Sequence, residues 1–440
     1  MIPHLVSAMA KPLADVEARI LAATPAVEHW FRSFWLDHTP PFYSSVDLRN
    51  SGFKVAPVDT NLFPGGFNNL DPAFTPLGVQ AAMVAIERFC PEARNLLLIP
   101  ENHTRNTFYL RSVARLATIL RQAGLNVRLG TLIPGVVEPL QVEVPDSEPL
   151  LLEPLVRRGT RLGLADFDPC TVLLNNDLSA GVPEILQGLD GQWVLPPLHA
   201  GWGTRRKSRH FACYDIVAAD FAGALEVDPW LVNPYHARCG EVNFKSRAGE
   251  ECLATNVEHV LARVRAKYLE YGIDEQPYVV VKADAGTYGM GVMTARSADD
   301  VVGLNRDTRK KMAVVKEGLE VSEVIIQEGV HTLETIKDAV AEPVVYMIDR
   351  YVVGGFYRVH TARGKDENLN APGMHFEPLA FAEPCIQPEP AAGCDAPRNR
   401  FYFYGVMARL AACAAALELE DTAPQESEDR NQGSEGLSYS

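Results

Sequence analysis

The sequence predicts an α/β protein built from more than one domain. It has 440 residues, of which 47% are hydrophobic, enough for two or three domains with substantial cores. Between residues 77 and 177, short apolar runs alternate with helical patterns, as in a sheet covered by helices. Between residues 278 and 294, two apolar segments enclose a glycine-rich loop, which predicts a strand, a loop and a second strand.

Composition and charge argue against several classes of protein. The net charge of −15 disfavours a general nucleic-acid binder, because such proteins hold phosphates with clustered Lys and Arg. No apolar run approaches eighteen residues and the N-terminus lacks a signal-peptide pattern, so we expect a cytoplasmic protein with no membrane contact. The eight cysteines include no CxxC pair and are expected to be reduced, although pairing of Cys385 with Cys394 stays open.

The elements before residue 180 follow from their hydrophobic spacing. Residues 10–37 predict two helices separated by a proline, residues 40–76 an irregular segment rich in Gly, Pro, Asn and Asp, and residues 76–89 a helix. The remaining predictions are strands at 95–100, 126–132 and 171–177, with a long helix at 105–124 that ends at a glycine.

The second half predicts a helical connection followed by a ligand-binding domain. Residues 181–209 predict a loop with a short helix, residues 215–272 are mostly helical in pattern, and residues 421–440 have the acidic composition of a disordered tail. The predicted organisation is N-terminal helices at 1–40, an α/β substrate domain at 41–200, a connection at 201–239, a nucleotide domain at 240–420, and the tail at 421–440.

The glycine-rich loop predicts a clamp over nucleotide phosphates. Lys282 ends the first apolar strand, and Gly286, Gly289 and Gly291 free the backbone to bend closely around an anion. No GK[ST] follows the glycines, and the loop returns to a strand, so it is neither a Walker A loop nor a Rossmann fingerprint. A strand-loop-strand clamp of this kind is used by ATP-grasp enzymes. An ordinary hairpin turn is the alternative.

Two later segments carry further candidate nucleotide-site residues. Gln327, Glu328 and Val330 end an apolar strand, where backbone groups can hold adenine and Glu328 can hold ribose; solvated strand-end polar residues are the alternative. After a predicted hairpin at 344–358, Arg358 is a candidate for bracing a transferred phosphoryl group. The candidate Mg²⁺ ligands, which offer hard oxygen atoms unless they simply form a polar loop, are Asp349, Glu367, Asn368 and Asn370.

Two polar constellations precede the nucleotide domain. In residues 45–70, Arg49 and Lys54 predict a site for the carboxylates of an acidic amino acid, with Asn61 and Asn68 as further polar contacts. In residues 198–211, Arg205 belongs to a local basic cluster in an otherwise acidic protein, which suits a phosphate or a substrate carboxylate. A tightly hydrogen-bonded loop and a solvated charged face are the respective alternatives.

With these motifs placed, the chain resembles the proteobacterial-type glutamate-cysteine ligases, which look like ATP-grasp enzymes related to glutathione synthetase. The resemblance spans roughly residues 10–415, and Arg105, in its second motif, becomes a further substrate-binding candidate. It is carried by the segments SVDLRNSGFKVAPVDTNLFPGGFNNL, IPENHTRNTFYLRSV, LHAGWGTRRKSRHF, VVVKADAGTYGMGV and DENLNAPGMHF.

The resemblance implies an ATP-grasp architecture and a reaction. ATP with Mg²⁺ would phosphorylate the γ-carboxyl of L-glutamate, and the amine of L-cysteine would displace phosphate to give γ-glutamylcysteine, the first step of glutathione biosynthesis. Lys282 and its loop would hold phosphates, Arg358 would steady the γ-phosphoryl group, and Arg49 and Lys54 would fix glutamate. Whether the protein forms a homo-oligomer is left open.

Residues 376–420 depart from the wider ATP-grasp pattern, because they lack the late Glu-x-Asn metal pair. The second nucleotide lysine is assigned to Lys245 by its spacing, with Lys267 as the alternative. Another ATP-grasp carboxylate-amine ligase and a noncatalytic ATP-binding protein are the competing interpretations.

Overall fold

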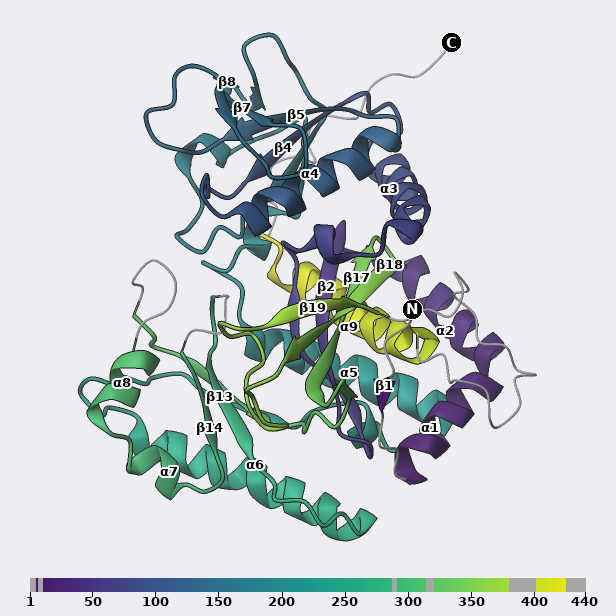
Figure 1. The fold of residues 1–440 in the computed structure, drawn as a ribbon, viewed down its shortest axis with the longest axis vertical. Coiled ribbons are helices and arrows are strands. Elements are labelled where there is room, and N and C mark those ends of the chain that lie inside the picture. Colours follow the sequence, from purple (N-terminus) through teal and green to yellow (C-terminus); the bar gives the residue numbers. More distant parts are fainter. Residues whose placement is uncertain (1–4, 7–10, 287–290, 314–319, 380–400, 425–440) are drawn as a thin grey trace, which may run out of the picture.

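Three β-sheets of seven, six and four strands, together with a two-stranded hairpin, form the framework of the molecule (Figure 1). The computed structural model describes residues 5–6, 11–286, 291–313, 320–379 and 401–424. The described elements mix helices with parallel and antiparallel strands, so the α/β prediction is confirmed at the level of fold class.

The six-stranded sheet is built by the middle of the first half of the chain. Its order is β11-β10-β4-β5-β7-β6, parallel except at the β6 edge. Alternate residues of β4 enter different cores, because Leu96 and Leu98 pack toward α3 and α4 while Leu97 and Ile99 face the opposite side. The bounds are α3 (Thr75–Phe89), β4 (Asn95–Pro100), α4 (Thr107–Gln122), β5 (Asn126–Thr131), β6 (Leu140–Val142), β7 (Leu150–Pro154), β10 (Thr171–Asn175) and β11 (Trp193–Leu195). The hairpin is β8 (Val156–Arg158) with β9 (Arg161–Gly163).

The seven-stranded sheet joins the two ends of the chain. Strands β2 and β3, from the first 61 residues, add to β17, which pairs with β18 on its other side. The expectation that residues 40–76 are irregular is therefore wrong for the two strands within 43–61. The Gly, Pro and Asp content of this segment is typical of loops, but burial in the sheet overrides that propensity. The bounds are β1 (Leu5–Val6), β2 (Tyr43–Asn50), β3 (Val55–Asn61), β16 (Thr335–Ile336), β17 (Ala339–Ile348), β18 (Tyr351–His360) and β19 (His375–Pro378).

The four-stranded antiparallel sheet has the order β12-β15-β13-β14 and carries the predicted glycine hairpin between β13 and β14. Strand β12 lies inside the segment expected to be mostly helical, where its four residues give too short a pattern to detect. The bounds are β12 (His236–Cys239), α6 (Glu250–Tyr271), β13 (Val279–Ala283), β14 (Val292–Ala295), α7 (Asp299–Val302), α8 (Arg306–Met312) and β15 (Val324–Glu328).

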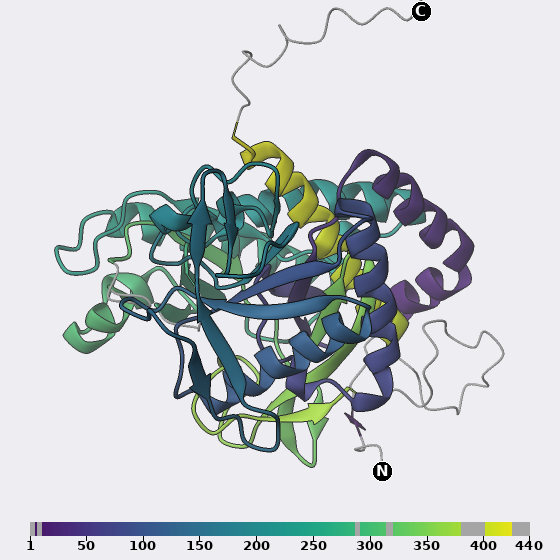
Figure 2. The ribbon, with the colours of Figure 1, turned by 90° about the horizontal axis from the view of Figure 1, so that it is seen from above.

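Helix α9 (Phe401–Thr422) lies at the centre of the molecule and packs against α5 (Lys207–Leu225), β2 and β3. Its segment 402–422 is long and apolar enough to cross a membrane, but 83% of its 18-residue apolar window is buried inside the protein, as in the core helix of a globular protein. The two helices predicted in residues 10–37 are α1 (Lys11–Ala22) and α2 (Thr24–Asp37). They lie on the side of the molecule opposite α7 and α8 (Figure 2).

The sheets group the chain differently from the predicted domain boundaries. Residues 43–61 share a sheet with residues 335–378 rather than with the α/β domain, and the predicted connection at 201–239 contains the core helix α5. Helix α9 continues to Thr422, and Asp421 pairs with Arg209, so the chain is still structured at the predicted start of the tail. Residues 425–440 lie outside the described residues.

Candidate active site

A cleft opens where the four-stranded sheet faces the seven-stranded sheet. Strands β2, β3, β13, β14, β15, β17 and β18 contribute to its walls, together with the first residue of α5 and the segment 366–370. Its charged or amide-bearing lining residues include Asp47, Arg49, Asp59, Lys207, Lys282, Gln327, Glu328, Glu342, Arg358, Asp366, Glu367, Asn368 and Asn370.

Lys282 projects into this cleft from β13. Its Nζ donates to the carbonyl oxygen of Val58 at 2.8 Å and to Oε1 of Gln327 at 2.6 Å. Burial lowers the pKa of Lys282 to about 8, although the carboxylate of Asp59 opposes the shift. Both hydrogen-bond acceptors are uncharged, so within the described part of the chain Lys282 has no direct ion-pair partner. Its charge remains available to an anion.

A second lysine in the cleft is neutralised. Lys207 Nζ lies 2.7 Å from Oδ1 of Asp59 and 4.2 Å from the ring centroid of Trp202. Burial alone would raise the pKa of Asp59, but Lys207, Lys282 and Arg205 lower it to about 2. Asp59 therefore remains ionised and balances one of the two cleft lysines.

Two arginines and two acids form a buried cluster on the seven-stranded sheet. Arg49 Nε lies 3.1 Å from Glu342 Oε2, and Arg358 Nη1 lies 2.9 Å from Asp47 Oδ2 and also donates to Glu342. Glu342 and Arg358 are opposite each other on β17 and β18, whereas Asp47 and Arg49 are two residues apart on β2. Burial opposes ionisation of Glu342, but the two arginines lower its pKa. The Nε atom of Arg358 is buried without a described partner.

The two described glycines of the hairpin adopt the backbone that the sequence predicts. Gly286 has a φ of +92° and Gly291 a φ of +62°, left-handed conformations that glycine adopts readily. Gly286 lines the cleft beside Lys282. Gly289, the third predicted glycine, lies outside the described residues.

Glu328 and Lys54 form a buried ion pair behind the cleft wall. Lys54 Nζ lies 2.8 Å from Glu328 Oε2, which also accepts from the backbone N–H of Tyr235 at 2.9 Å, while Trp230 Nε1 donates to Oε1 at 3.1 Å. Lys54 is 0% exposed and is absent from the lining residues. Lys54 therefore does not reach the cleft, and protein donors already engage the Glu328 carboxylate that was predicted to hold ribose. Val330 lines the cleft, and its carbonyl accepts from Arg49 at 3.3 Å.

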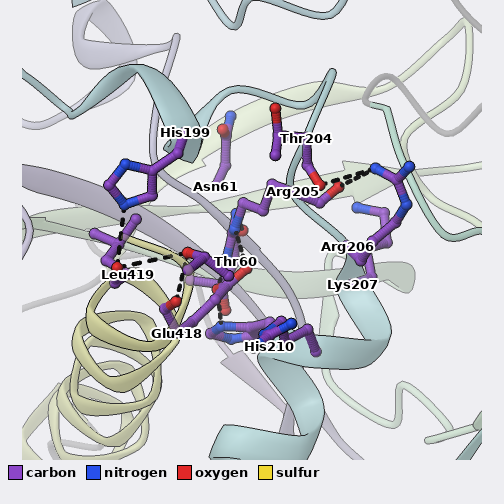
Figure 3. Close-up of polar contacts among 12 residues, drawn as sticks. Thr60, Asn61, His199, Thr204, Arg205, Arg206, Lys207, His210, Glu418 and Leu419 are labelled. Atoms are coloured by element: carbon purple, nitrogen blue, oxygen red, sulfur yellow. Dashed lines mark hydrogen bonds and ion pairs between the residues drawn. The ribbon is translucent and has the colours of Figure 1, made fainter. Parts of the chain in front are cut away.

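Arg205 belongs to a second buried network, shown in Figure 3. Its Nε and Nη2 lie 2.9 Å from the two carboxylate oxygens of Glu418 on α9, and Nη1 donates to the carbonyl of Thr60 at 2.6 Å. Nδ1 of His210 lies 3.0 Å from the same carboxylate. Burial opposes ionisation of Glu418, yet Arg205 and His210 lower its pKa to about 2. Arg205 thus connects the segment before α5 to α9, and the prediction that it contacts substrate receives no support.

Three other predicted residues lie away from the lining residues. Lys245 is exposed and pairs with Glu320, and Arg105 is exposed in the segment before α4. Asp349 sits in the tight turn between β17 and β18, where it pairs with Arg88 instead of facing the cleft. The fold does not bring these three residues to the cleft, because they were chosen by residue type and spacing, which do not fix the direction of a side chain. Their nucleotide, substrate and metal roles stay predictions.

The two predicted asparagines in the first constellation make local contacts. Asn61 Oδ1 accepts from the backbone N–H of Phe63 at 3.0 Å, and Asn68 Nδ2 donates to Asn69 Oδ1 at 3.1 Å. Neither residue is among those that line the cleft. Such side-chain hydrogen bonds are common in loops and fit the alternative of a tied-down segment.

The remaining metal candidates do lie at the cleft. The cleft lining includes Asp366 together with Glu367, Asn368 and Asn370. Their side chains offer hard oxygen atoms, which a divalent cation that accompanies nucleotide phosphates prefers. Glu367 is already engaged, because it accepts from Arg363 at 2.8 Å and from the N–H of Gly364 at 2.7 Å. Among the described residues, no group of three His, Cys, Asp or Glu side chains is arranged to hold a metal by itself. The donor chemistry fits a cation whose other ligands come from the nucleotide.

Sequence reasoning missed Glu342, which bridges Arg49 and Arg358. The available signal was an acid isolated within the apolar strand 339–348, because a buried carboxylate needs a charged or hydrogen-bonding partner. Asp47, Asp59 and Lys207 belong to the two polar segments 45–70 and 198–211, and only the folding of the chain brings them into the cleft with Lys282.

Comparison with known proteins gives the family. A family model described as glutamate-cysteine ligase matches residues 17–419. A crystal structure from Methylobacillus flagellatus KT, assigned as a gamma-glutamylcysteine synthetase, is 62% identical, with a TM-score of 0.89 over 96% of this chain and 100% of that one.

A more distant match is a glutathione synthetase-like effector from Globodera pallida in its apo form, 12% identical with a TM-score of 0.36 over 81% of this chain and 82% of that one, too low to carry an argument. No curated protein matches the chain. On the family match and the close structural relative, the chain belongs to the glutamate-cysteine ligase family, whose members join L-glutamate to L-cysteine at the expense of ATP.

Proposed function

We propose that the cleft between the four-stranded and seven-stranded sheets is where this ligase activates L-glutamate, by forming a γ-glutamyl phosphate from ATP. A carboxylate is a poor acyl donor, so its oxygen first attacks the γ-phosphorus of ATP and ADP leaves. The amine of L-cysteine then attacks the acyl carbon, and phosphate leaves. The protein's contribution is to position the reactants and to stabilise the charge that develops during both transfers.

The observation that carries the proposal is the charge of Lys282, which has no ion-pair partner in the described part of the chain and lies beside the glycine hairpin. Phosphate oxygens beside its ammonium group would favour its protonated form. Gly286 allows the backbone to approach the phosphates without a side chain in the way. The two antiparallel sheets facing each other across the cleft support an ATP-grasp architecture, with the nucleotide between them.

Arg358 and Arg49 are the candidate positioning groups for the carboxylate and its phosphorylated form. Both are buried, held by Glu342, and line the cleft. The unpartnered Nε of Arg358 is a donor available for an incoming oxygen if the cluster rearranges on binding. A Mg²⁺ ion would be held by oxygen atoms of Asp366, Glu367, Asn368 or Asn370 together with the phosphates, and would offset phosphate charge.

The test is phosphate release from ATP and Mg²⁺ with L-glutamate, adding L-cysteine, 2-aminobutyrate or glycine in turn, with product identification by mass. L-cysteine should drive turnover and give γ-glutamylcysteine. Turnover with γ-glutamylcysteine plus glycine, and none with glutamate plus cysteine, would instead indicate a glutathione-synthetase-like ligase. Loss of turnover in Arg358→Gln with normal ATP affinity would support the role of Arg358 on the acyl side.

A further inference from the structure

Two cysteines in the four-stranded-sheet region lie unusually close together. The sulfur atoms of Cys239 and Cys252 are 2.9 Å apart, and a disulfide needs about 2.05 Å, so they would have to approach by less than about 1 Å. Cys239 ends β12 and is 1% exposed, whereas Cys252 is the third residue of α6 and is exposed to solvent. Asn256 Nδ2 lies 3.4 Å from the Cys252 sulfur, which helps to fix its position.

We propose that Cys239 and Cys252 are a thiol pair that a low-molecular-weight disulfide converts to an intramolecular disulfide. The Cys252 thiolate attacks one sulfur of the small disulfide, whose S–S bond breaks and releases one small thiolate. Cys239 loses its proton and attacks the Cys252 sulfur of the mixed disulfide, which releases the second. Two protein thiols are thereby oxidised, and the small disulfide is reduced to two thiols that take up the two protons.

The order of the two steps follows from accessibility. An external disulfide reaches Cys252, whereas the buried Cys239 reaches only its neighbour. Burial, with help from Cys252, raises the pKa of the Cys239 thiol to about 12, which makes Cys239 the slower, resolving thiol. By contrast, Cys213 and Cys413 are buried in the helical core and have no comparable access.

The crosslink would stabilise one part of the molecule rather than lock the cleft. Among the described strands, β12 is an edge strand that pairs, through Cys239 and its neighbours, with β15 alone. Helix α6 packs against both β12 and β15. A disulfide would attach this edge to the start of α6 and close the intervening segment 240–251. Because the two sulfur atoms are already close in the folded protein, the crosslink would restrict the unfolded chain more than the folded one, which stabilises the fold.

The experiment treats the full-length protein with bis(2-hydroxyethyl) disulfide, alkylates the remaining thiols after denaturation, and maps the cysteine peptides by mass. We expect a Cys239–Cys252 crosslinked peptide that dithiothreitol removes, that is absent from Cys252→Ser, and that persists in the control Cys213→Ser. Because Cys90 also contacts Cys170, the map must distinguish that pair. A stable mixed disulfide at Cys252 with Cys239 still alkylated would overturn the proposal.

Melting temperature gives a second readout that does not depend on peptide recovery. The oxidised protein should melt at least about 2 °C higher than the reduced protein, and the rise should disappear on reduction and be missing in Cys252→Ser. An equal rise in Cys252→Ser would show that another modification is responsible and would refute the stabilising role.

Discussion

Lys54 and Lys282 have similarly lowered pKa values, but their surroundings differ. Burial lowers the pKa of each to about 8. Lys54 is completely enclosed and pairs with Glu328 at 2.8 Å, whereas Lys282 lines the cleft and, among the described residues, donates only to uncharged oxygens of Val58 and Gln327. A shifted pKa alone therefore does not mark a functional lysine. What distinguishes the two is whether the charge is already neutralised and whether a ligand can reach it.

The same contrast separates the arginines. Arg205 is saturated by both oxygens of Glu418 and by a backbone carbonyl, in a site away from the cleft lining. Arg358 is also paired, but it lines the cleft and retains an unpartnered Nε among its described contacts. Saturated pairs hold the scaffold together, and incompletely satisfied groups at the cleft are the candidates for catalysis.

We expect Lys282→Met to have the largest effect on activity. Removing the unpaired cation from the phosphate side should reduce kcat/KM by about 10³-fold, or about 4 kcal/mol of transition-state stabilisation. The melting temperature should stay close to that of the wild type, because relief from burying a charge offsets two lost hydrogen bonds. Steady-state kinetics with varied ATP and a thermal melt measure both. Unchanged turnover would contradict the assignment of Lys282.

Lys54→Met should show the reverse pattern. It leaves Glu328 buried without its cation and should lower the free energy of unfolding by about 3 kcal/mol, while kcat under folding conditions stays within a few-fold of wild type. Denaturant midpoints measure the loss. Adding Glu328→Gln removes the orphaned charge and should restore most of the stability. A Lys54→Met protein with normal stability and a greatly increased KM for glutamate would show that substrate contacts Lys54 after all.

The pH dependence should sharpen the comparison further. The pKa of Lys282 falls from its ordinary 10.5 to about 8 on folding, so between those values the unfolded chain holds a proton that the folded chain has lost. Below pH 8 the folded protein must bury the charged lysine, which costs free energy of folding, and this cost disappears as the lysine loses its proton at higher pH. Considered alone, this group therefore makes the ligand-free protein more stable at higher pH. Nucleotide affinity should move the other way, falling up to roughly tenfold per pH unit above 8.

That decline can be measured as the Kd of a nonhydrolysable ATP analogue between pH 7 and pH 9.5, values chosen to bracket the transition. Lys282→Arg is the matched variant, because arginine keeps its charge throughout this range. Its affinity should show no break near pH 8. A break that survives in Lys282→Arg would assign the titration to another group.

The smallest effect is expected for Asp421→Asn at the end of α9. The pair with Arg209 is largely exposed, with side-chain exposures of 60% and 47%, and such pairs contribute less than about 1 kcal/mol. Neither turnover nor the denaturant midpoint should change detectably. By comparison, Arg205→Met in the buried network of the same helix should lower the midpoint strongly. Equal effects would mean that burial does not distinguish the two pairs.

Much of this architecture was predictable because it depends on local patterns. Helical spacing identified α1 to α4, apolar runs identified β4, β5 and β10, and the glycine hairpin with Lys282 followed from one short segment. Arg49 and Arg358 were chosen from separate motifs that carry unusual combinations of charged residues, and the fold brings both to one cleft. The chemical roles of all three stay predictions.

What failed depended on long-range packing. Strands β2 and β3 were taken for a loop because β3 pairs with β2, and β2 in turn pairs with β17, almost 300 residues away. Arg205 and Lys207 are two residues apart, yet one is bound to α9 and the other faces the cleft. Composition could not separate them, since only the path of the chain before α5 decides where each side chain points.

The most direct test of the central claim uses L-glutamate labelled with ¹⁸O in its γ-carboxylate. If the cleft forms γ-glutamyl phosphate, the phosphate released with L-cysteine should carry one ¹⁸O from glutamate. Lys282→Met should form labelled phosphate far more slowly, whereas Lys54→Met, assayed while folded, should form it at nearly the normal rate. Phosphate without label, formed together with γ-glutamylcysteine, would contradict the acyl phosphate and the proposed chemistry of the cleft.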